Sequence, residues 1–236
     1  MTDSKDNPVA TGLQGPVKGV RFHLVSEGYV STGSAESPLA FPYHNPLLSY
    51  FIDHYDPKSN AVVEALIGTG QFAFVWHAIQ PLLDKGKSTI VVVPPQMAMS
   101  VSHNLTKRFG ESIVGLCTNS KHGVPEQAII VTSQYRLADA SKKKEPWATG
   151  AGLVVVYEAA YMLLRSAKNA FSPFTSVLEE TGGSLLLLSG TCCPSPIWAL
   201  AKRFNADLYL RGPRDVFGFC KNDPAVIEGL LKFLNP

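Results

Sequence analysis

Apolar residues occur along the chain in short all-apolar runs, separated by stretches with an apolar residue at every third or fourth position. Runs rich in Val, Ile and Leu are typical of parallel strands buried on both faces of a sheet. They predict strands over 61–67, 88–93, 112–117, 127–131, 152–157, 185–189 and 207–210. The helical spacing predicts helices over 46–55, 72–83, 97–109, 135–140, 158–168, 174–181 and 196–204. This alternation indicates an α/β fold with a mainly parallel, doubly wound sheet.

The N-terminal part of the chain differs from the rest. Residues 1–45 are rich in Pro, Gly, Ser and Thr, and the only regular pattern in them is a strand expected over 17–25. We therefore expect a flexible or loosely packed segment over 1–45, an α/β domain over 46–215 and a C-terminal extension over 216–236.

The composition narrows the class of protein. With 45% hydrophobic and 17% charged residues, the chain can bury a sizeable core, and its net charge of +2 favours no particular partner. None of the four cysteines forms a CxxC pair, so we expect no zinc or other metal site, and so few cysteines fit a reducing compartment. We see no secretory signal and no run near the ~20 apolar residues of a membrane span, so we expect an intracellular protein, nuclear or cytoplasmic.

A glycine-rich turn, Gly68-Thr69-Gly70, joins a predicted strand to a predicted helix. Such a turn offers N–H groups and the positive end of a helix dipole to an anion, although its glycines could equally serve only to make a tight turn. A phosphate-binding loop that hydrolyses ATP continues with Lys and then Ser or Thr. Here Gln71 and Phe72 stand at those positions, so neither the cation nor the metal-binding hydroxyl is present.

The same turn also fits the dinucleotide fingerprint GxGxxA over 68–73. That fingerprint requires an acidic residue at the end of the following strand, to bind the ribose hydroxyls. The strand ends instead in the neutral sequence VVPPQ over 92–96, which weakens an NAD(P)-dependent oxidoreductase as an alternative.

Four later segments resemble helicase motifs, and they occur in the order of those motifs. Residues 88–96 are similar to motif Ia, 131–139 to motif Ib, 153–164 to the Asp-Glu-Ala-His box and 187–191 to motif III. The chain thus resembles, over residues 60–215, the first RecA-like domain of a superfamily-two helicase, and RecQ-like helicases are the most similar. The resemblance implies a RecA-like P-loop NTPase architecture.

The resemblance also implies roles for particular residues. The nucleotide would lie against Gly68, Thr69, Gly70, Gln71, Phe72 and Tyr157. Glu158 would be the general base, although a carboxylate there could simply cap a helix. Nucleic acid would meet Gln96, Ser102, Thr132, Ser133, Lys142, Lys143 and Lys144, although a lysine run is often only a solvated loop. Ser189 and Thr191 would couple the nucleotide site to the nucleic-acid site.

The departures from the motifs matter as much as the matches. Tyr157 stands where the box has the metal-orienting Asp, and Ala160 stands where it has His. The resemblance places a second RecA-like domain after residues 211–214, and we do not expect one in this chain. We therefore expect a catalytically degenerate helicase-like domain that binds single-stranded nucleic acid or a protein. It would need no cofactor, although weak ATP or ADP binding is compatible with it. A weak ATPase of the same fold is the first alternative.

Overall fold

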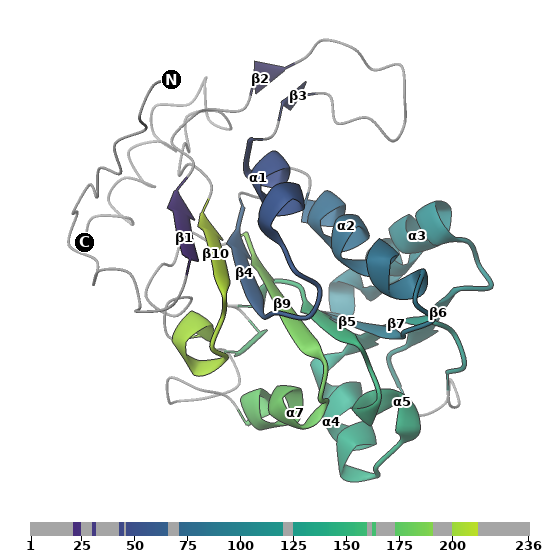
Figure 1. Ribbon diagram of the computed structural model, residues 1–236. Coiled ribbons are helices and arrows are strands. Elements are labelled where there is room, and N and C mark those ends of the chain that lie inside the picture. The colour runs from purple at the N-terminus through teal and green to yellow at the C-terminus, as the bar shows by residue number, and fades with distance from the viewer. Residues whose placement is uncertain are drawn as a thin grey trace, which may run out of the picture.

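The computed structural model describes residues 21–24, 30–31, 43–44, 46–65, 71–119, 125–159, 162–163, 173–190 and 200–211. Eight strands in these residues form one sheet in the order β1-β10-β4-β9-β8-β5-β7-β6 (Figure 1). All neighbouring strands in this sheet are parallel. The strands are β1 (Arg21–Leu24), β4 (Ala61–Glu64), β5 (Thr89–Val93), β6 (Val114–Cys117), β7 (Ile129–Ser133), β8 (Leu153–Val156), β9 (Ser184–Ser189) and β10 (Leu208–Arg211). The α/β fold and the parallel sheet expected from the sequence are therefore confirmed.

Helices cover both faces of this sheet (Figure 1). One core cluster contains residues of α1 (Pro46–His54), α2 (Gln71–Leu83) and α3 (Ala98–Phe109), which follows the 3-10 turn η1 (Pro95–Met97). The second contains residues of α4 (Gln134–Lys142), α5 (Pro146–Thr149), α7 (Phe174–Glu180) and the helical residues 200–203. None of the helices in the described residues is long and apolar enough to cross a membrane.

The all-apolar strands follow from this three-layer arrangement. In β5, Val91 and Val93 pack into the cluster with α2 and α3, whereas Ile90 and Val92 pack into the cluster with α4 and α7. All four side chains are fully buried. Successive residues of a strand point to opposite faces, so a strand between two helical layers must be apolar at every position.

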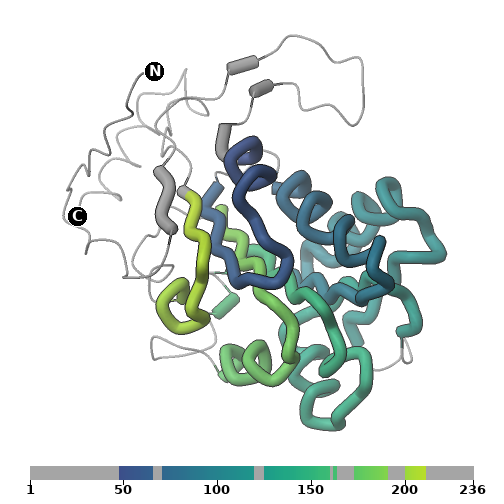
Figure 2. The backbone as a smooth tube through the Cα atoms, viewed as in Figure 1, coloured from purple at the N-terminus to yellow at the C-terminus, as the bar shows by residue number. Residues whose placement is uncertain are grey.

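The N-terminal part of the chain contains a strand within the range expected, 17–25. Residues 21–24, inside the segment expected to be loosely packed, form an edge strand that pairs with β10. β10 in turn pairs with β4, so two strands far apart in the sequence lie side by side (Figure 2). The lysines at 142–144 lie at the end of α4 and in the turn after it, and the short helix α5 begins at Pro146. A second, two-stranded sheet joins β2 (Val30–Ser31) to β3 (Tyr43–His44).

The parallel registers bring the predicted site segments to one edge of the sheet. Glu64, at the end of β4, lies beside Ser189, at the end of β9, and Val156 of β8 lies beside Leu187 of β9. Val93 of β5 lies beside Ser133 of β7. The residues that follow these strands therefore meet at the carboxyl edge, where parallel α/β sheets bind their ligands.

Candidate functional site

The glycine turn lies between β4 and α2. Gly68, Thr69 and Gly70 lie outside the described residues, but the residues on either side of them are placed. Gln71 is the first residue of α2, and its Nε2 donates a hydrogen bond of 3.0 Å to the carbonyl oxygen of Ala65. The Gln71 side chain thus links the two sides of the turn with a neutral amide, and it brings no positive charge to the position.

Phe72 and Tyr157 are in contact. Their ring centroids are 5.5 Å apart, and Phe72 also meets Trp76 one turn further along α2, at 6.5 Å. Tyr157 is only 1% exposed, and burial raises the pKa of its phenol well above the ordinary value. The hydroxyl therefore stays protonated, and it has no hydrogen-bond partner in the part of the chain that the structure describes.

This contact bears directly on metal binding. The helicase resemblance would place Mg²⁺ between the side chains at positions 72 and 157, which in a hydrolysing P-loop protein are a hydroxyl and a carboxylate. Mg²⁺ requires oxygen ligands in near-octahedral geometry. A phenyl ring and a buried neutral phenol do not fit that requirement, and no cluster of His, Cys, Asp and Glu suited to a metal occurs among the described residues.

Glu158 follows Tyr157 in an unusual conformation. Its φ is +50°, in the left-handed region that a residue with a side chain rarely adopts. The half-buried carboxylate accepts a 3.4 Å hydrogen bond from the backbone N–H of Gly190, immediately after Ser189. Burial raises the pKa of Glu158, and the Gly190 hydrogen bond partly opposes that shift. The structure therefore brings the box and the Ser189 segment together, whereas Thr191 lies outside the described residues.

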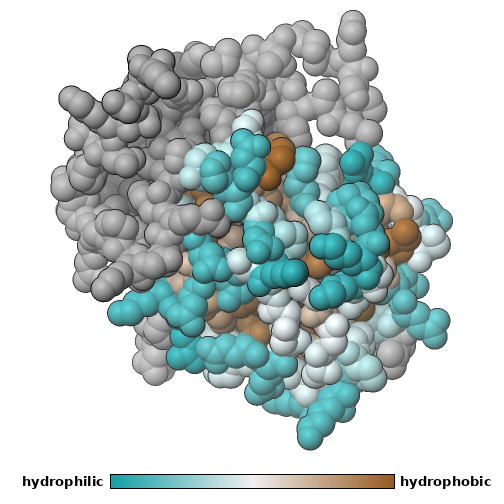
Figure 3. Space-filling view, in the orientation of Figure 1, coloured by the Kyte–Doolittle hydropathy of each residue, from teal (hydrophilic) through white to brown (hydrophobic). Residues whose placement is uncertain are grey.

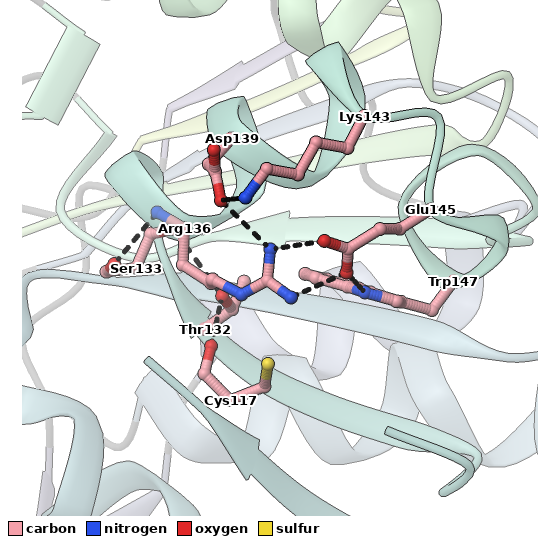
Figure 4. Close-up of polar contacts among 8 residues, drawn as sticks. All are labelled: Cys117, Thr132, Ser133, Arg136, Asp139, Lys143, Glu145 and Trp147. Carbon is pink, nitrogen blue, oxygen red and sulfur yellow. Dashed lines mark hydrogen bonds and ion pairs between the residues drawn. The ribbon is translucent and has the colours of Figure 1, made fainter. Parts of the chain in front are cut away.

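Thr132 and Ser133, predicted to contact nucleic acid, are buried and bonded within the protein (Figure 4). The Thr132 hydroxyl donates to the carbonyl oxygen of Cys117 at 2.6 Å, which ties β7 to β6. Ser133 is the N-cap of α4, because its Oγ accepts a hydrogen bond from the backbone N–H of Arg136 at 3.2 Å. The two side chains therefore stabilise the end of β7 and the start of α4 at the carboxyl edge.

The other residues of the predicted nucleic-acid set lie in two places. Gln96 is exposed in η1 and Ser102 is half-buried on α3, both after β5. Lys142, Lys143 and Lys144 are exposed, but they lie at the C-terminal end of α4 and in the turn after it. The nine residues of α4, at ~1.5 Å per residue, place these lysines a helix length away from Ser133. The structure does not bring the whole set together.

A buried ionic cluster beside α4 was not found from the sequence. The Arg136 guanidinium is 5% exposed and donates to both carboxylate oxygens of Glu145, at 2.9 and 2.5 Å (Figure 4). Trp147 Nε1 donates to the same carboxylate at 2.7 Å, and the guanidinium lies over the Trp147 ring at 5.3 Å. The hydrogen bonds from Arg136 hold the pKa of Glu145 below its ordinary value. A Trp two residues after a Glu on a short helix is too common a pattern to have revealed this cluster.

A second buried carboxylate lies next to the glycine turn. Glu64, the last residue of β4, is 7% exposed and accepts a hydrogen bond from the Tyr209 hydroxyl on β10. Sequence reasoning assigned Glu64 no role, although a single acidic residue that ends an all-apolar strand is a signal that could have indicated a buried carboxylate.

The comparisons with known proteins agree with this architecture. No protein-family model and no curated protein sequence matches the chain. Among solved structures, a hypothetical ATP-dependent RNA helicase from Sulfolobus tokodaii aligns with a TM-score of 0.55 at 21% identity, over 70% of this chain and 51% of that one. The Hef helicase domain of Pyrococcus furiosus aligns with a TM-score of 0.54 at 15% identity, over 77% of this chain and 39% of that one. The SWI2/SNF2 ATPase core of Sulfolobus solfataricus was solved in complex with double-stranded DNA. It aligns with a TM-score of 0.53 at 12% identity, over 71% of this chain and 43% of that one.

The chain thus spans about half or less of the length of each of these structures. The strand order also separates the fold from the dinucleotide-binding arrangement, in which the first two strands of the fingerprint unit are neighbours. Here β9 and β8 lie between β4, before the glycine turn, and β5, after it. The chain therefore has the α/β fold of the RecA-like domains of helicases.

Proposed function

We propose that this chain is a helicase-like domain that binds single-stranded nucleic acid and does not hydrolyse ATP. The observation that carries the proposal is the contact between Phe72 and Tyr157, at 5.5 Å between ring centroids. Aromatic rings occupy the two positions at which ATP hydrolysis requires metal ligands, so these positions lack the chemistry that the fold otherwise supports.

The remaining groups are too few to replace that chemistry. Glu158 would act as the general base, but a general base contributes only about 10²–10⁴-fold. Its raised pKa also reduces the fraction that is ionised. Gln71 offers no cation to the β- and γ-phosphates, and its amide is bonded to Ala65. Phosphoryl transfer depends on neutralising the phosphate charge, so we expect no Mg²⁺-dependent turnover above background.

The binding half of the proposal rests on the carboxyl edge beyond β5 and β7. Two neighbouring strands end there at Val93 and Ser133, and α3 and α4 begin beside them. Thr132 and Ser133 fix this edge from within, Gln96 is exposed on it, and Ser102 lies further along α3. Lys142, Lys143 and Lys144 would meet the phosphates of a strand that extends past the far end of α4.

Two measurements test the proposal. The first is phosphate release over hours with Mg²⁺-ATP, with and without an oligonucleotide, beside a Glu158→Gln variant. Turnover that disappears in the variant would contradict the proposal. The second is fluorescence anisotropy with labelled single-stranded DNA and RNA at low salt. If neither binds, the nucleic-acid function is wrong, and the protein-binding alternative gains weight.

A second candidate is a domain that binds a nucleotide without hydrolysing it. The hydrogen bond of 3.4 Å between Glu158 and the Gly190 N–H favours it, because two motifs around the cleft remain connected. A ligand that binds the native state raises the melting temperature by mass action. ATP or ADP in EDTA would raise it if this candidate is correct, whereas NAD and NADPH would leave it unchanged.

A further inference from the structure

Three large hydrophobic side chains are strongly exposed among the described residues, and two of them lie at the carboxyl edge. Tyr135 is 67% exposed in the first turn of α4, and Met99 is 71% exposed in the first turn of α3. The third, Ile52, is 47% exposed on α1. Elsewhere, the described surface facing the viewer in Figure 3 is mainly hydrophilic, and hydrophobic residues show only in separate places.

Tyr135 and Met99 flank the same part of the sheet. They follow β7 and β5, which are neighbours with Ser133 beside Val93. The helices α3 and α4 belong to opposite layers, because their buried residues fall in different core clusters. The two exposed side chains therefore approach the edge from its two faces.

The backbone that carries Tyr135 is held firmly. Ser133 caps the helix through the Arg136 N–H at 3.2 Å, and the Arg136 guanidinium is bound by both oxygens of Glu145. Tyr135 lies between these two fixed residues in the sequence. A rigid aromatic residue loses little conformational entropy on binding, which favours it as a contact residue.

The described segments that follow the strands near Tyr135 are neutral, and the half-exposed Asp139, one turn further along α4, is paired with Lys143 and Arg136. The described residues that follow β5, β6 and β7 at this edge, over 94–100, 118–119 and 134–135, include no acidic or basic side chain. Exposed amides, hydroxyls and a thioether beside an aromatic ring match the face and the polar edge of a base better than they match a phosphate.

We propose that Tyr135 is a platform on which a base of single-stranded DNA or RNA stacks, and that Met99, on the other face of the same edge, makes a smaller apolar contact with the strand. The inference rests on the proposed nucleic-acid function and names the group that would read the bases. It also separates two contributions to affinity: stacking at the carboxyl edge and phosphate contacts at the lysines after α4.

The test uses fluorescence anisotropy with the full chain and a labelled single-stranded oligonucleotide, beside an abasic oligonucleotide of the same length and charge. Tyr135→Ala should weaken binding to the base-containing strand by about 5- to 150-fold, the range for losing one stacked base. It should leave the abasic strand unaffected. Tyr135→Phe should keep the wild-type affinity, Met99→Ala should cause a smaller loss, and Ile52→Ala is the matched exposed control with no loss.

Salt concentration provides an independent check. The fold-loss caused by Tyr135→Ala should be the same in low and moderate salt, because stacking releases no counterions. Replacing Lys142, Lys143 and Lys144 by Ala should instead reduce the salt dependence itself. DNA and RNA versions of the strand determine which sugar the edge accepts.

Three other outcomes would contradict the inference, and they show whether the proposed function fails with it. If the wild-type chain binds the strand and Tyr135→Ala binds equally well, the stacking platform is wrong and the proposed function survives. If Tyr135→Ala weakens both strands equally, Tyr135 contacts the backbone and not a base. If the wild-type chain binds neither strand, the proposed function and the inference both fail.

Discussion

The carboxyl edge of the sheet has two halves that differ sharply in chemistry. Beside β4 and β8, two aromatic rings meet at the positions expected to hold a metal, with the buried Tyr157 against Phe72. Beside β7, polar groups are dense and almost all bonded, from Thr132 and Ser133 to Arg136 and Glu145 (Figure 4). The first half has aromatic rings where the resemblance would place metal ligands, whereas the second contains a buried ionic cluster.

A buried ion pair and a buried aromatic contact differ in what they cost the folded state. A buried carboxylate and cation must be desolvated, and the pair often contributes no more stability than well-packed apolar residues would. An aromatic contact carries no such penalty and contributes through its buried area. The Arg136 cluster therefore fits a role in holding the first turn of α4, where Tyr135 is exposed, and the aromatic contact fits a role in packing, as proposed above.

The largest expected effect comes from restoring the acidic residue at the metal position. Tyr157→Asp removes an aromatic side chain that is 1% exposed and places a carboxylate in the same apolar site. We expect a loss of about 4 kcal/mol in the free energy of unfolding, measured by urea denaturation. Tyr135→Asp, at an exposed tyrosine, should change stability by less than about 0.5 kcal/mol. Equal losses in the two variants would mean that the Phe72–Tyr157 site is not packed as described.

That result also bears on attempts to restore catalysis. The combined change Gln71→Lys, Phe72→Ser and Tyr157→Asp replaces the packed aromatic contact with the polar groups of a metal site. We expect the combination to recover nucleotide binding before it recovers hydrolysis, which thermal shift and phosphate release would separate.

The second prediction concerns the ionic cluster. Glu145→Gln leaves the Arg136 guanidinium, 5% exposed, with Asp139 at 3.6 Å as its remaining charged partner in the described residues. Breaking a buried pair in this way should destabilise the protein by about 3 kcal/mol. The matched control is Glu179→Gln, which breaks the pair with Arg203, in which both side chains are 43% exposed. That variant should lose less than about 1 kcal/mol. Similar losses would show that Arg136 does not depend on Glu145.

Lowering the pH should change the stability contributions of Glu145 and Glu158 in opposite directions. The pKa of Glu145 is below its ordinary value of 4.5, so its contribution is present above 4.5 and is lost as the pH falls through the folded-state pKa. The stability gap between the wild type and Glu145→Gln should therefore shrink in acid. The pKa of Glu158 is raised, so wild-type stability should fall relative to Glu158→Gln as the pH rises from 4.5. Urea denaturation across this pH range would measure both trends.

A smaller effect is expected at the N-cap of α4. Ser133→Ala removes the oxygen that accepts the Arg136 N–H at 3.2 Å. Loss of a serine cap typically costs about 1 kcal/mol. If the cap also orients Tyr135, the variant should bind a base-containing strand more weakly than its loss of stability alone would explain. Unchanged stability would mean that another group caps the helix.

The sequence predicted the sheet well because strands between two helical layers are apolar on both faces. β8 satisfies that rule at every position, and β5 satisfies it from Ile90 to Val93. The sequence also predicted that Gln71, Phe72 and Tyr157 stand in place of motif residues, and this stays a prediction. It could not predict that Phe72 and Tyr157 touch, since long-range contacts leave no mark in a local pattern. The separation of Lys142 from Ser133 could have been predicted, because a helix of nine residues carries its two ends apart.

The smallest predicted effect is at the Tyr157 hydroxyl, and its sign tests the account of the aromatic site. This hydroxyl is buried without a hydrogen-bond partner in the described part of the chain, so Tyr157→Phe should keep the packing against Phe72 and remove an uncompensated desolvation penalty. We expect a gain of up to about 1 kcal/mol in thermal or urea unfolding. Tyr209→Phe is the matched contrast, because the Tyr209 hydroxyl donates to the buried Glu64, and its loss should destabilise the protein. If Tyr157→Phe is destabilised as much as Tyr209→Phe, the Tyr157 hydroxyl is bonded in solution, and the site still contains a polar group that a ligand could use.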